Sequence, residues 1–251
     1  MQKNYKSLGL MSGTSGDGVD ASLIISNGIN SYEPIQDKYY EYDENIYKNF
    51  HAIKDKINNK TDIKKLASEL NELEKNITLF HAKIIKDLNI KDPDCLIGFH
   101  GQTIYHNPLE KISVQLGNPK LLFQLIKKKI IFNFRKNDIL NEGQGAPLTP
   151  IYHEALMKHL KIVDPRLIVN IGGITNVTYL NRGNIFSTDI GPGNCLIDKW
   201  MRVNSNKKYD KSGSLAKKGK INNGRLQYLF NYYNKMGLKN LYSYDIYAFN
   251  S

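Results

Sequence analysis

"MSGTSGDGVD", residues 11–20, is the most informative motif for the fold of this chain. It contains three glycines and two carboxylates and joins two apolar runs, Ser7 to Met11 and Val19 to Ser26, which predict two strands. Glycine reaches backbone conformations that other residues rarely adopt. In such a loop, the hydroxyls of Thr14 and Ser15 and their backbone N–H groups could point as hydrogen-bond donors into one concave site. The stretch therefore predicts a strand, a glycine loop that cradles phosphate, and a second strand.

A plain hairpin turn is the alternative interpretation of this loop. Asp17 and Gly18 are typical turn residues, and turn chemistry alone favours this simpler interpretation. Two common nucleotide motifs are excluded. A Walker loop would need Gly-Lys-Ser/Thr after the glycines, and both it and a Rossmann fingerprint lead into a helix, whereas a strand is expected here.

The first part of the chain alternates strands with helices. Apolar residues at three- and four-residue steps predict a helix from about Asp62 to Leu88. Such alternation is typical of an α/β fold. Strands are expected at Cys95 to Phe99, Val114 to Leu116 and Ile130 to Phe134, with a short helix near Leu121 to Lys127.

A second part follows a loop at Gly143 to Pro150, "GQGAPLTP". We place the boundary near this loop, which divides the chain into two lobes, residues 1–145 and 146–251. Helices are expected at Ile151 to Leu160 and Cys195 to Val203, and helical structure is expected in the remainder to Ser251. Between the two helices, strands are expected at Leu167 to Ile171, Asn176 to Leu180 and Ile185 to Ser187, with a turn at Asn181 to Asn184.

Two further glycine turns lie at the ends of predicted strands, in "NIGGITNVT" (170–178) and "TDIGPGNCLID" (188–198). Ligand sites in open α/β sheets gather at such places, and three glycine loops suggest one large polar ligand. Asp189 leaves a strand end into a glycine turn, so it is a candidate general base. The alternative is a turn carboxylate that accepts hydrogen bonds from local amides.

Other polar residues give weaker signals. His100 follows a strand and could orient a substrate, although a lone histidine beside a glycine is usually a structural hydrogen-bonding residue. Arg135 and Asp138 could contact an anionic substrate or each other. Cys95 and Cys195 match neither a disulfide framework nor a zinc site, and no histidine pair has metal-ligand spacing. Mg²⁺ bound by phosphates and one or two carboxylates would leave little trace in a sequence.

The composition favours a globular, cytoplasmic protein. The chain has 251 residues, 41% of them hydrophobic, which is enough for a sizeable core. Its formal net charge of +11 would permit nucleic-acid binding, but the lysines are scattered and no arginine-rich tract occurs, so no nucleic-acid partner is expected. The sequence shows no secretory signal and no stretch of membrane-spanning length, so no membrane association is expected.

Eight stretches together resemble the successive signature blocks of the anhydro-N-acetylmuramic acid kinases. Eight blocks in register are far more specific than any single glycine motif. In chain order, between Leu8 and about Gly219, they are GLMSGTSGDGVD, GFHGQTIYH, VQLGN, FRKNDI, GQGAPLTPIYHEAL, NIGGITNVT, DIGPGNCLIDKW and YDKSGSLAKKG.

This resemblance implies an actin-like ATPase fold, in which two ribonuclease-H-like lobes clamp ATP. It also implies a kinase that adds water to the anomeric carbon of 1,6-anhydro-N-acetylmuramic acid, opens the anhydro ring and phosphorylates the 6-oxygen. The product would be N-acetylmuramic acid 6-phosphate, formed in peptidoglycan recycling. ATP and Mg²⁺ would be the cofactors, and the amino sugar would be the small-molecule partner.

The same resemblance assigns roles to particular residues. Asp189 would be the general base that activates water, and Asp17 would lie near Mg²⁺ or the transferred phosphoryl group. Around the ATP phosphates the implied residues are Gly13, Thr14, Ser15, Gly16, Asp17 and Gly18. At the sugar they are His100, Gln102 and Arg135. In the cleft floor they are Gly172, Gly173, Asn176, Gly191 and Asn194.

The chain departs from the family pattern in three places. Gly16 stands where the family usually has Leu, which adds backbone freedom to the loop, and Lys136-Asn137 replace a more basic pair. The sequence stops at Ser251, before the segment that contributes the adenine side of the pocket in the family, so the second lobe is expected to be incomplete. The alternative function is therefore a non-catalytic fragment that keeps the fold or sugar binding. An incomplete lobe would also expose core surface, which leaves a homodimer open.

Overall fold

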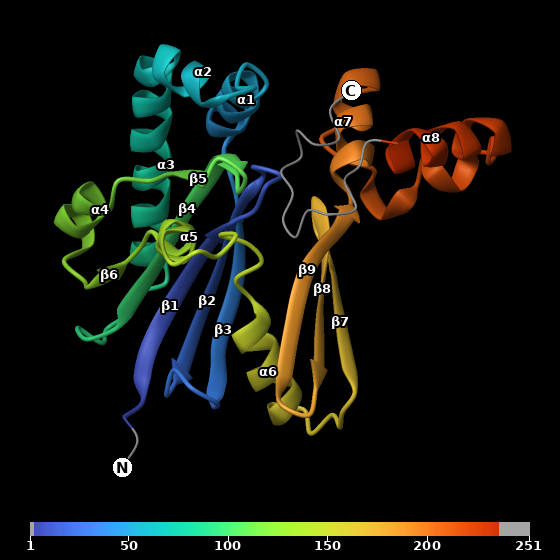
Figure 1. The fold of residues 1–251 in the computed structure, drawn as a ribbon. Coiled ribbons are helices and arrows are strands. Elements are labelled where there is room, and N and C mark those ends of the chain that lie inside the picture. Colours follow the sequence, from blue (N-terminus) through green and yellow to red (C-terminus); the bar gives the residue numbers. More distant parts are fainter. Residues whose placement is uncertain (1–2, 236–251) are drawn as a thin grey trace.

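The computed structural model describes residues 3–235 and contains two β-sheets with a helix between them (Figure 1). The larger sheet is mixed: its strand order is β3-β2-β1-β4-β5, and the short β6 pairs with β4. β1 runs antiparallel to β2 and parallel to β4. The strands are β1 (Tyr5–Ser12), β2 (Gly18–Ser26), β3 (Tyr32–Glu41), β4 (Leu96–Asn107), β5 (Ile112–Leu116) and β6 (Ile130–Ile131).

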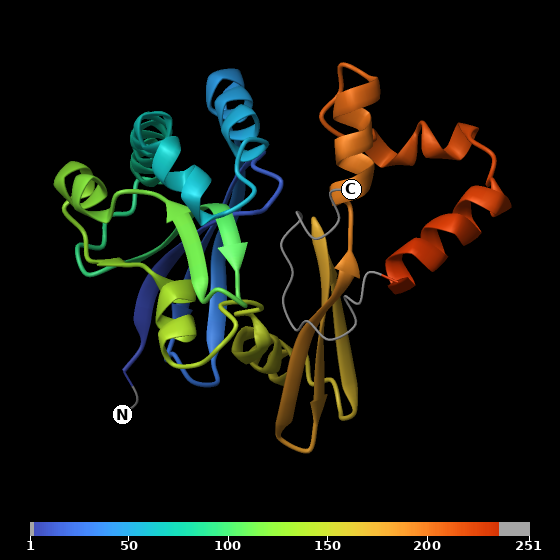
Figure 2. The ribbon, with the colours of Figure 1, turned by 45° about the horizontal axis from the view of Figure 1, so that its top comes forward.

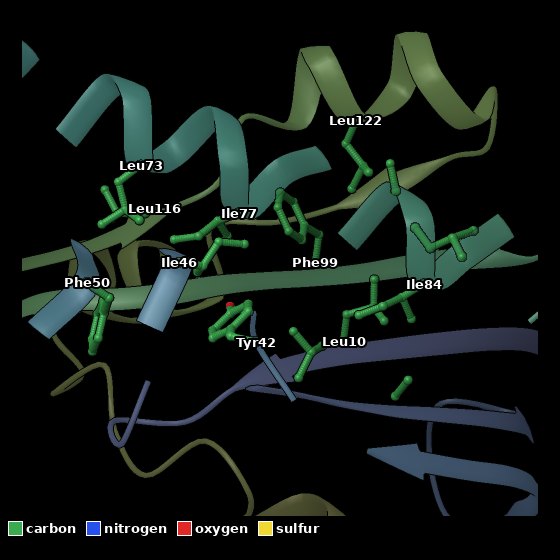
Figure 3. Close-up of a cluster of buried hydrophobic side chains, with 14 of the residues drawn as sticks. Leu10, Tyr42, Ile46, Phe50, Leu73, Ile77, Ile84, Phe99, Leu116 and Leu122 are labelled. Atoms are coloured by element: carbon green, nitrogen blue, oxygen red, sulfur yellow. The ribbon is translucent and has the colours of Figure 1, made fainter. Parts of the chain in front are cut away.

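The hydrophobic core lies on one face of this sheet, under α1, α3 and α4 (Figure 3). Side chains alternate along β1, so that Leu8 and Leu10 are buried while Met11 is exposed. α3 carries an apolar stripe that includes Leu73 and Ile77, both buried. The helices of this first part are α1 (Glu44–Lys54), α2 (Lys60–Lys65), α3 (Ala67–Asp87), α4 (Pro119–Ile126), α5 (Phe134–Leu140) and α6 (Pro150–His159).

The opposite face of the large sheet carries small side chains and meets α5 and α6. Ser7, Gly9 and Gly98 lie there, and together with Phe134 of α5 and Tyr152 of α6 they line an apolar cavity. Tyr32 of β3 also contacts Tyr152, with ring centroids 5.4 Å apart. α6 therefore packs near the large sheet and also contacts β8 and β9 of the second sheet.

The second sheet is an antiparallel meander of β7 (Arg166–Ile171), β8 (Ile174–Asn181) and β9 (Asn184–Pro192). Two-residue turns join its strands. Arg182 and Gly183 both have positive φ, 49° and 80°, which suits a hairpin turn that follows the strand twist. After β9 come α7 (Cys195–Asn204), two short 3-10 turns, η1 (Lys211–Gly213) and η2 (Ala216–Lys218), and α8 (Asn223–Lys235) (Figure 2).

The second sheet buries less of its apolar surface than the first. Leu167, Val169 and Ile171 alternate along β7 and are 61%, 50% and 63% exposed. None of the helices within residues 3–235 has the length and apolar character needed to cross a bilayer.

The α/β class and most of the strand positions predicted from the sequence are confirmed. Both predicted strand–glycine turn–strand units are present, as β1–β2 and as β7–β8. The expected helices at 121–127, 151–160 and 195–203 correspond to α4, α6 and α7. The division at residue 145 into two lobes stays a prediction.

Five details of the predicted element pattern were wrong. The helix expected from Asp62 to Leu88 is broken at Leu66, which has non-helical φ and ψ of −95° and 16°. β4 continues from Phe99 to Asn107, whereas the strand expected at Ile130 to Phe134 has only two residues because α5 begins at Phe134. β3 was missed, since its side chains are mostly exposed and polar and show no apolar alternation. Residues 205–222 contain 3-10 turns and no α-helix, and the part of the predicted helical tail beyond residue 235 lies outside the described residues.

Four buried or half-buried histidines predict a pH dependence of stability. Burial away from water is the main cause that lowers the pKa of His51, His81 and His106 to about 4 and that of His100 to about 3. In the unfolded chain they titrate near 6.5, so between pH 6.5 and about 4 the unfolded state binds more protons than the folded state. We expect the free energy of unfolding to be largest above pH 6.5 and to fall as the pH drops through this window.

Equilibrium denaturation of the chain across this range, with His81→Gln and the exposed His159→Gln compared, measures the effect. Each buried histidine contributes a slope of up to about 1.4 kcal/mol per pH unit. His81→Gln should reduce the slope by that amount, whereas His159→Gln should leave it unchanged. Equal slopes in all three proteins would contradict the assignment.

Candidate active site

The β1–β2 loop, residues 13–17, is held in a tight shape by backbone hydrogen bonds and by packing against Phe50. The amide of Gly16 donates to the carbonyl of Gly13 at 3.2 Å, and the amide of Tyr42 donates to the carbonyl of Asp17 at 2.9 Å. Gly16 has a φ of +64°, and a Cβ added there would lie 2.1 Å from the Phe50 ring. Only glycine therefore fits at this position, and the packing against Phe50 limits the backbone freedom that a glycine adds.

Gln102 supports the loop from the neighbouring strand. It is fully buried in β4, and its Nε2 donates to the carbonyl of Gly13 at 2.8 Å. Ser12, just before the loop, lies 2.9 Å from the hydroxyl of Tyr42 and 3.4 Å from Nε2 of His81. The loop is thus fixed to the core of the large sheet.

The turn between β7 and β8, Gly172-Gly173, faces this loop. A Cβ added to Gly173 would lie 3.7 Å from Cβ of Thr14, which is van der Waals contact. The turn is itself held by the start of α7. The amide of Gly193 donates to Gly173 at 2.9 Å, and that of Asn194 donates to Gly172 at 2.8 Å. The two glycine turns predicted separately from the sequence therefore lie side by side.

Asp189 points inward because β9 contains a bulge. Asn176 pairs with Asp189 and Thr175 with Gly191, so Ile190 is an extra residue in β9. Asp189 is 7% exposed, whereas Ile190 is 56% exposed. Within residues 3–235, Oδ1 of Asn176 is a buried acceptor without a hydrogen-bond partner. A carboxylate and an amide acceptor thus lie together on adjacent strands.

A cleft cavity of about 270 Å³ collects these groups between the two sheets. Eight of the residues singled out from the sequence line it, whereas Gly16, Gly18, His100, Gln102 and Gly191 do not. Asp17 and Asn194 line a neighbouring cavity that shares Ser15 with the first. The eight that line the cleft cavity are Gly13, Thr14, Ser15, Arg135, Gly172, Gly173, Asn176 and Asp189.

His100 lies behind Arg135 and positions it. Nε of Arg135 donates to Nε2 of His100 at 2.9 Å, and Nη1 donates to the carbonyl of Gly145 at 2.9 Å. Nδ1 of His100 lies 2.7 Å from the carbonyl of Gly101, so this nitrogen carries the proton and Nε2 is the acceptor. Burial and the nearby guanidinium lower the pKa of His100 to about 3, which keeps this neutral form at pH 7.

Asp138 organises the loop that follows α5. Its carboxylate accepts from the amide of Gly145 at 2.7 Å, and its carbonyl accepts from the amide of Gly143 at 2.8 Å. A Cβ on Gly143 would lie 2.0 Å from the carboxylate, so a side chain is excluded there. Arg135 and Asp138 each hydrogen-bond Gly145 of this loop. Arg135 also lines the cleft cavity, so it connects the loop to the cavity.

Sequence reasoning missed several residues of the cavity. Thr103 and His106 line it because β4 continues well past Phe99, and the loop after Gly145 lines it with Ala146 to Thr149. Nδ1 of His106 lies 3.0 Å from the hydroxyl of Ser113. The one signal was that these residues fall inside the quoted blocks GFHGQTIYH and GQGAPLTPIYHEAL.

The neighbouring cavity, of about 390 Å³, contains charges of both signs. Asp17, Asp198 and Arg202 line it together with Lys208, which follows α7. Lys208 Nζ lies 2.8 Å from Oε1 of Glu41. Burial, opposed by Arg202, raises the pKa of Asp198, and Asp17 raises it further. Within residues 3–235 no cluster of three or more histidine, cysteine or acidic side chains could hold a metal ion by itself.

A sequence profile described as anhydro-N-acetylmuramic acid kinase matches residues 5–240. The chain belongs to this family. It is 49% identical over 252 residues to an anhydro-N-acetylmuramic acid kinase of Pelagibacter ubique, and the match covers 98% of this chain and 67% of that protein. Relatives with the same description from Agrobacterium fabrum and Rhodopseudomonas palustris are 36% and 34% identical, and in each the match covers 85% of this chain and 60% of the relative. The chain thus spans about two thirds or less of the length of these family members.

The packing at Gly16 gives a test of the loop. Gly16→Ala should lower the free energy of unfolding by about 1 to 2 kcal/mol, because alanine is strained in the left-handed backbone conformation. The overlap of its Cβ with Phe50 should lower it by about 1 to 3 kcal/mol more. Gly28→Ala is the matched control, because Gly28 also has a positive φ of 73° but has no atom within 4 Å of the added Cβ. Urea denaturation of both variants measures the difference. If the two variants lost equal stability, the contact between the loop and Phe50 would not constrain the loop.

Proposed function

We propose that this chain carries the kinase chemistry of its family. The enzyme would add water to 1,6-anhydro-N-acetylmuramic acid and transfer a phosphoryl group from ATP to the 6-oxygen. The observation that carries this proposal is the meeting of both glycine turns and Asp189 on one cavity. Two sheets with opposed phosphate-binding turns also favour an actin-like ATPase fold of two ribonuclease-H-like lobes.

The ATP phosphates would lie between the two glycine turns. Backbone amides in such turns stabilise negative charge without bringing side chains close to the ligand. Asp17 offers a carboxylate in the neighbouring cavity, where its Oδ1 accepts a hydrogen bond from Ser15, and carboxylate oxygen is the donor that Mg²⁺ prefers. When bound there, Mg²⁺ would neutralise charge on the phosphates.

Asp189 would act on the attacking water. The carboxylate takes one proton while the water oxygen bonds to the anomeric carbon, and the bond from that carbon to the 6-oxygen breaks. The 6-oxygen bonds to the terminal phosphorus of ATP as the bond from phosphorus to the bridging oxygen breaks, and ADP leaves. The products are N-acetylmuramic acid 6-phosphate and ADP, with the proton on Asp189 passing to solvent. Asn176 would accept a hydrogen bond from the sugar, since its Oδ1 is buried at the cavity.

We place this reaction in peptidoglycan recycling in the cytoplasm, as the family resemblance implies. A homodimer stays a prediction. Gln102 and His100 would act behind the sugar pocket, by holding Gly13 and Arg135, and Gly191 and Asn194 would shape the turn beside Asp189.

Sugar-dependent ADP release is the experiment that tests the proposal. The purified chain would be assayed with ATP, Mg²⁺ and 1,6-anhydro-N-acetylmuramic acid, and each component would be omitted in turn. We expect release only when all three are present. Calorimetric binding of the sugar without any ADP release would show a binding protein without turnover and would contradict the proposed activity.

Asp189→Asn tests the assignment of the base. Because the amide cannot accept the proton, the rate should fall by about 10²- to 10⁴-fold while the affinity for the sugar changes little. Asp94→Asn, at an exposed turn before β4, is the matched control and should keep full activity. An unchanged rate in Asp189→Asn would remove this residue from the role of base.

A further inference from the structure

The two sheets are joined covalently near one end only. Within residues 3–235, the chain passes once from the large sheet to the second sheet, through residues 141–165, which include α6. α6 lies near one end of both sheets, whereas α1 and α7 lie near the other end (Figure 1). A rotation of one sheet about α6 would therefore change the distance between α1 and α7 more than the distance between the sheets beside α6.

Each of these two helices holds one of the glycine turns. Phe50 of α1 packs against Gly16 of the β1–β2 loop and leaves no room for a side chain there. Just before α7, the amide of Asn194 donates to the carbonyl of Gly172 at 2.8 Å and so holds the β7–β8 turn. The position of α7 relative to α1 therefore sets the spacing of the two turns.

Polar contacts join α7 and the residues after it to α1. Nζ of Lys208 lies 2.8 Å from Oε1 of Glu41, 4.0 Å from Oε2 of Glu44 and 4.2 Å from the ring centre of Tyr47. Arg202 of α7 also hydrogen-bonds Tyr47, which is buried. Among the ion pairs with both partners in residues 3–235, only those of Lys208 join residues 3–140 to residues 166–235.

Two carboxylates oppose this contact. Asp17 of the β1–β2 loop and Asp198 of α7 line the same neighbouring cavity from the two sides. Burial raises the pKa of Asp198, Arg202 opposes this, and the negative charge of Asp17 raises the pKa further, as like charges do. Without cations between them, these carboxylates would push α7 away from the loop. Arg202 and Lys208 line the same cavity and supply the opposite charge.

We propose that Lys208, together with Arg202, latches α7 onto α1 and so holds the two glycine turns at their spacing in the cleft. Lys208 is a positioning residue, because it acts through the two helices and does not line the cleft cavity. The inference goes beyond the proposed reaction, since it concerns the chain without any ligand. A partly exposed ion pair and a cation–π contact each shift an equilibrium by up to about fivefold, so the latch favours the closed cleft and still lets it open.

Distances between two spin labels test the inference. The labels would be attached at exposed positions, Glu72→Cys on α3 and Val203→Cys on α7, with the half-buried Cys195 replaced by serine in every protein compared. Lys208→Gln should lengthen the distances and raise the ratio of open to closed molecules by roughly 5- to 20-fold. Lys208→Arg keeps the charge and should keep most of the short distance.

Lys207→Gln is the matched control, since it removes the same charge from an exposed neighbour and should leave the distances unchanged. Because Lys208 acts through Glu41, its replacement should have a smaller effect in a Glu41→Gln background. Unchanged distances in Lys208→Gln would overturn the inference, as would an equal lengthening in Lys207→Gln, which would indicate an effect of net charge. If Lys208→Gln does not fold, Glu41→Gln decides: longer distances support the latch and unchanged distances refute it. No sugar or nucleotide is present, so failure here leaves the proposed function standing.

Discussion

The hydrogen bond from the Gln102 amide to the carbonyl of Gly13 is the contact on which the site depends. A glycine loop has little side-chain packing of its own, and glycine has the largest backbone freedom to lose on folding. Gln102 supplies the missing constraint from the middle of β4, and Phe50 supplies another from α1. The loop thereby takes its shape from the hydrophobic core and can present its backbone to a ligand.

The second glycine turn is constrained in a different way. Gly172 and Gly173 accept hydrogen bonds from Gly193 and Asn194, so the end of β9 and the start of α7 fix the turn. The bulge at Ile190 lies just before this contact and turns Asp189 inward. One local irregularity in β9 thus sets both the position of the candidate base and the position of the turn that faces Thr14.

The sequence predicted the parts of the site that have a backbone signature. Glycine runs after apolar strands indicated both turns, and Asp189 was found because it precedes such a turn. The long-range supports carried no such signal: His100 looks like a lone histidine in the sequence, and only the fold brings Arg135 to its Nε2. β3 was missed for a related reason, because an edge strand with exposed polar side chains needs no apolar alternation.

Charge placement in the cleft follows from what is buried beneath it. Histidines of α1, α3 and β4 lie in the large sheet and the helices on it, and burial lowers their pKa to about 3 or 4, which keeps them neutral at pH 7. If His100 were charged, it would repel Arg135 and lose the lone pair that accepts its Nε–H, so neutrality is a condition for the present geometry. The field in the cavity is then set by Arg135, Asp189 and the oriented backbone of two glycine turns.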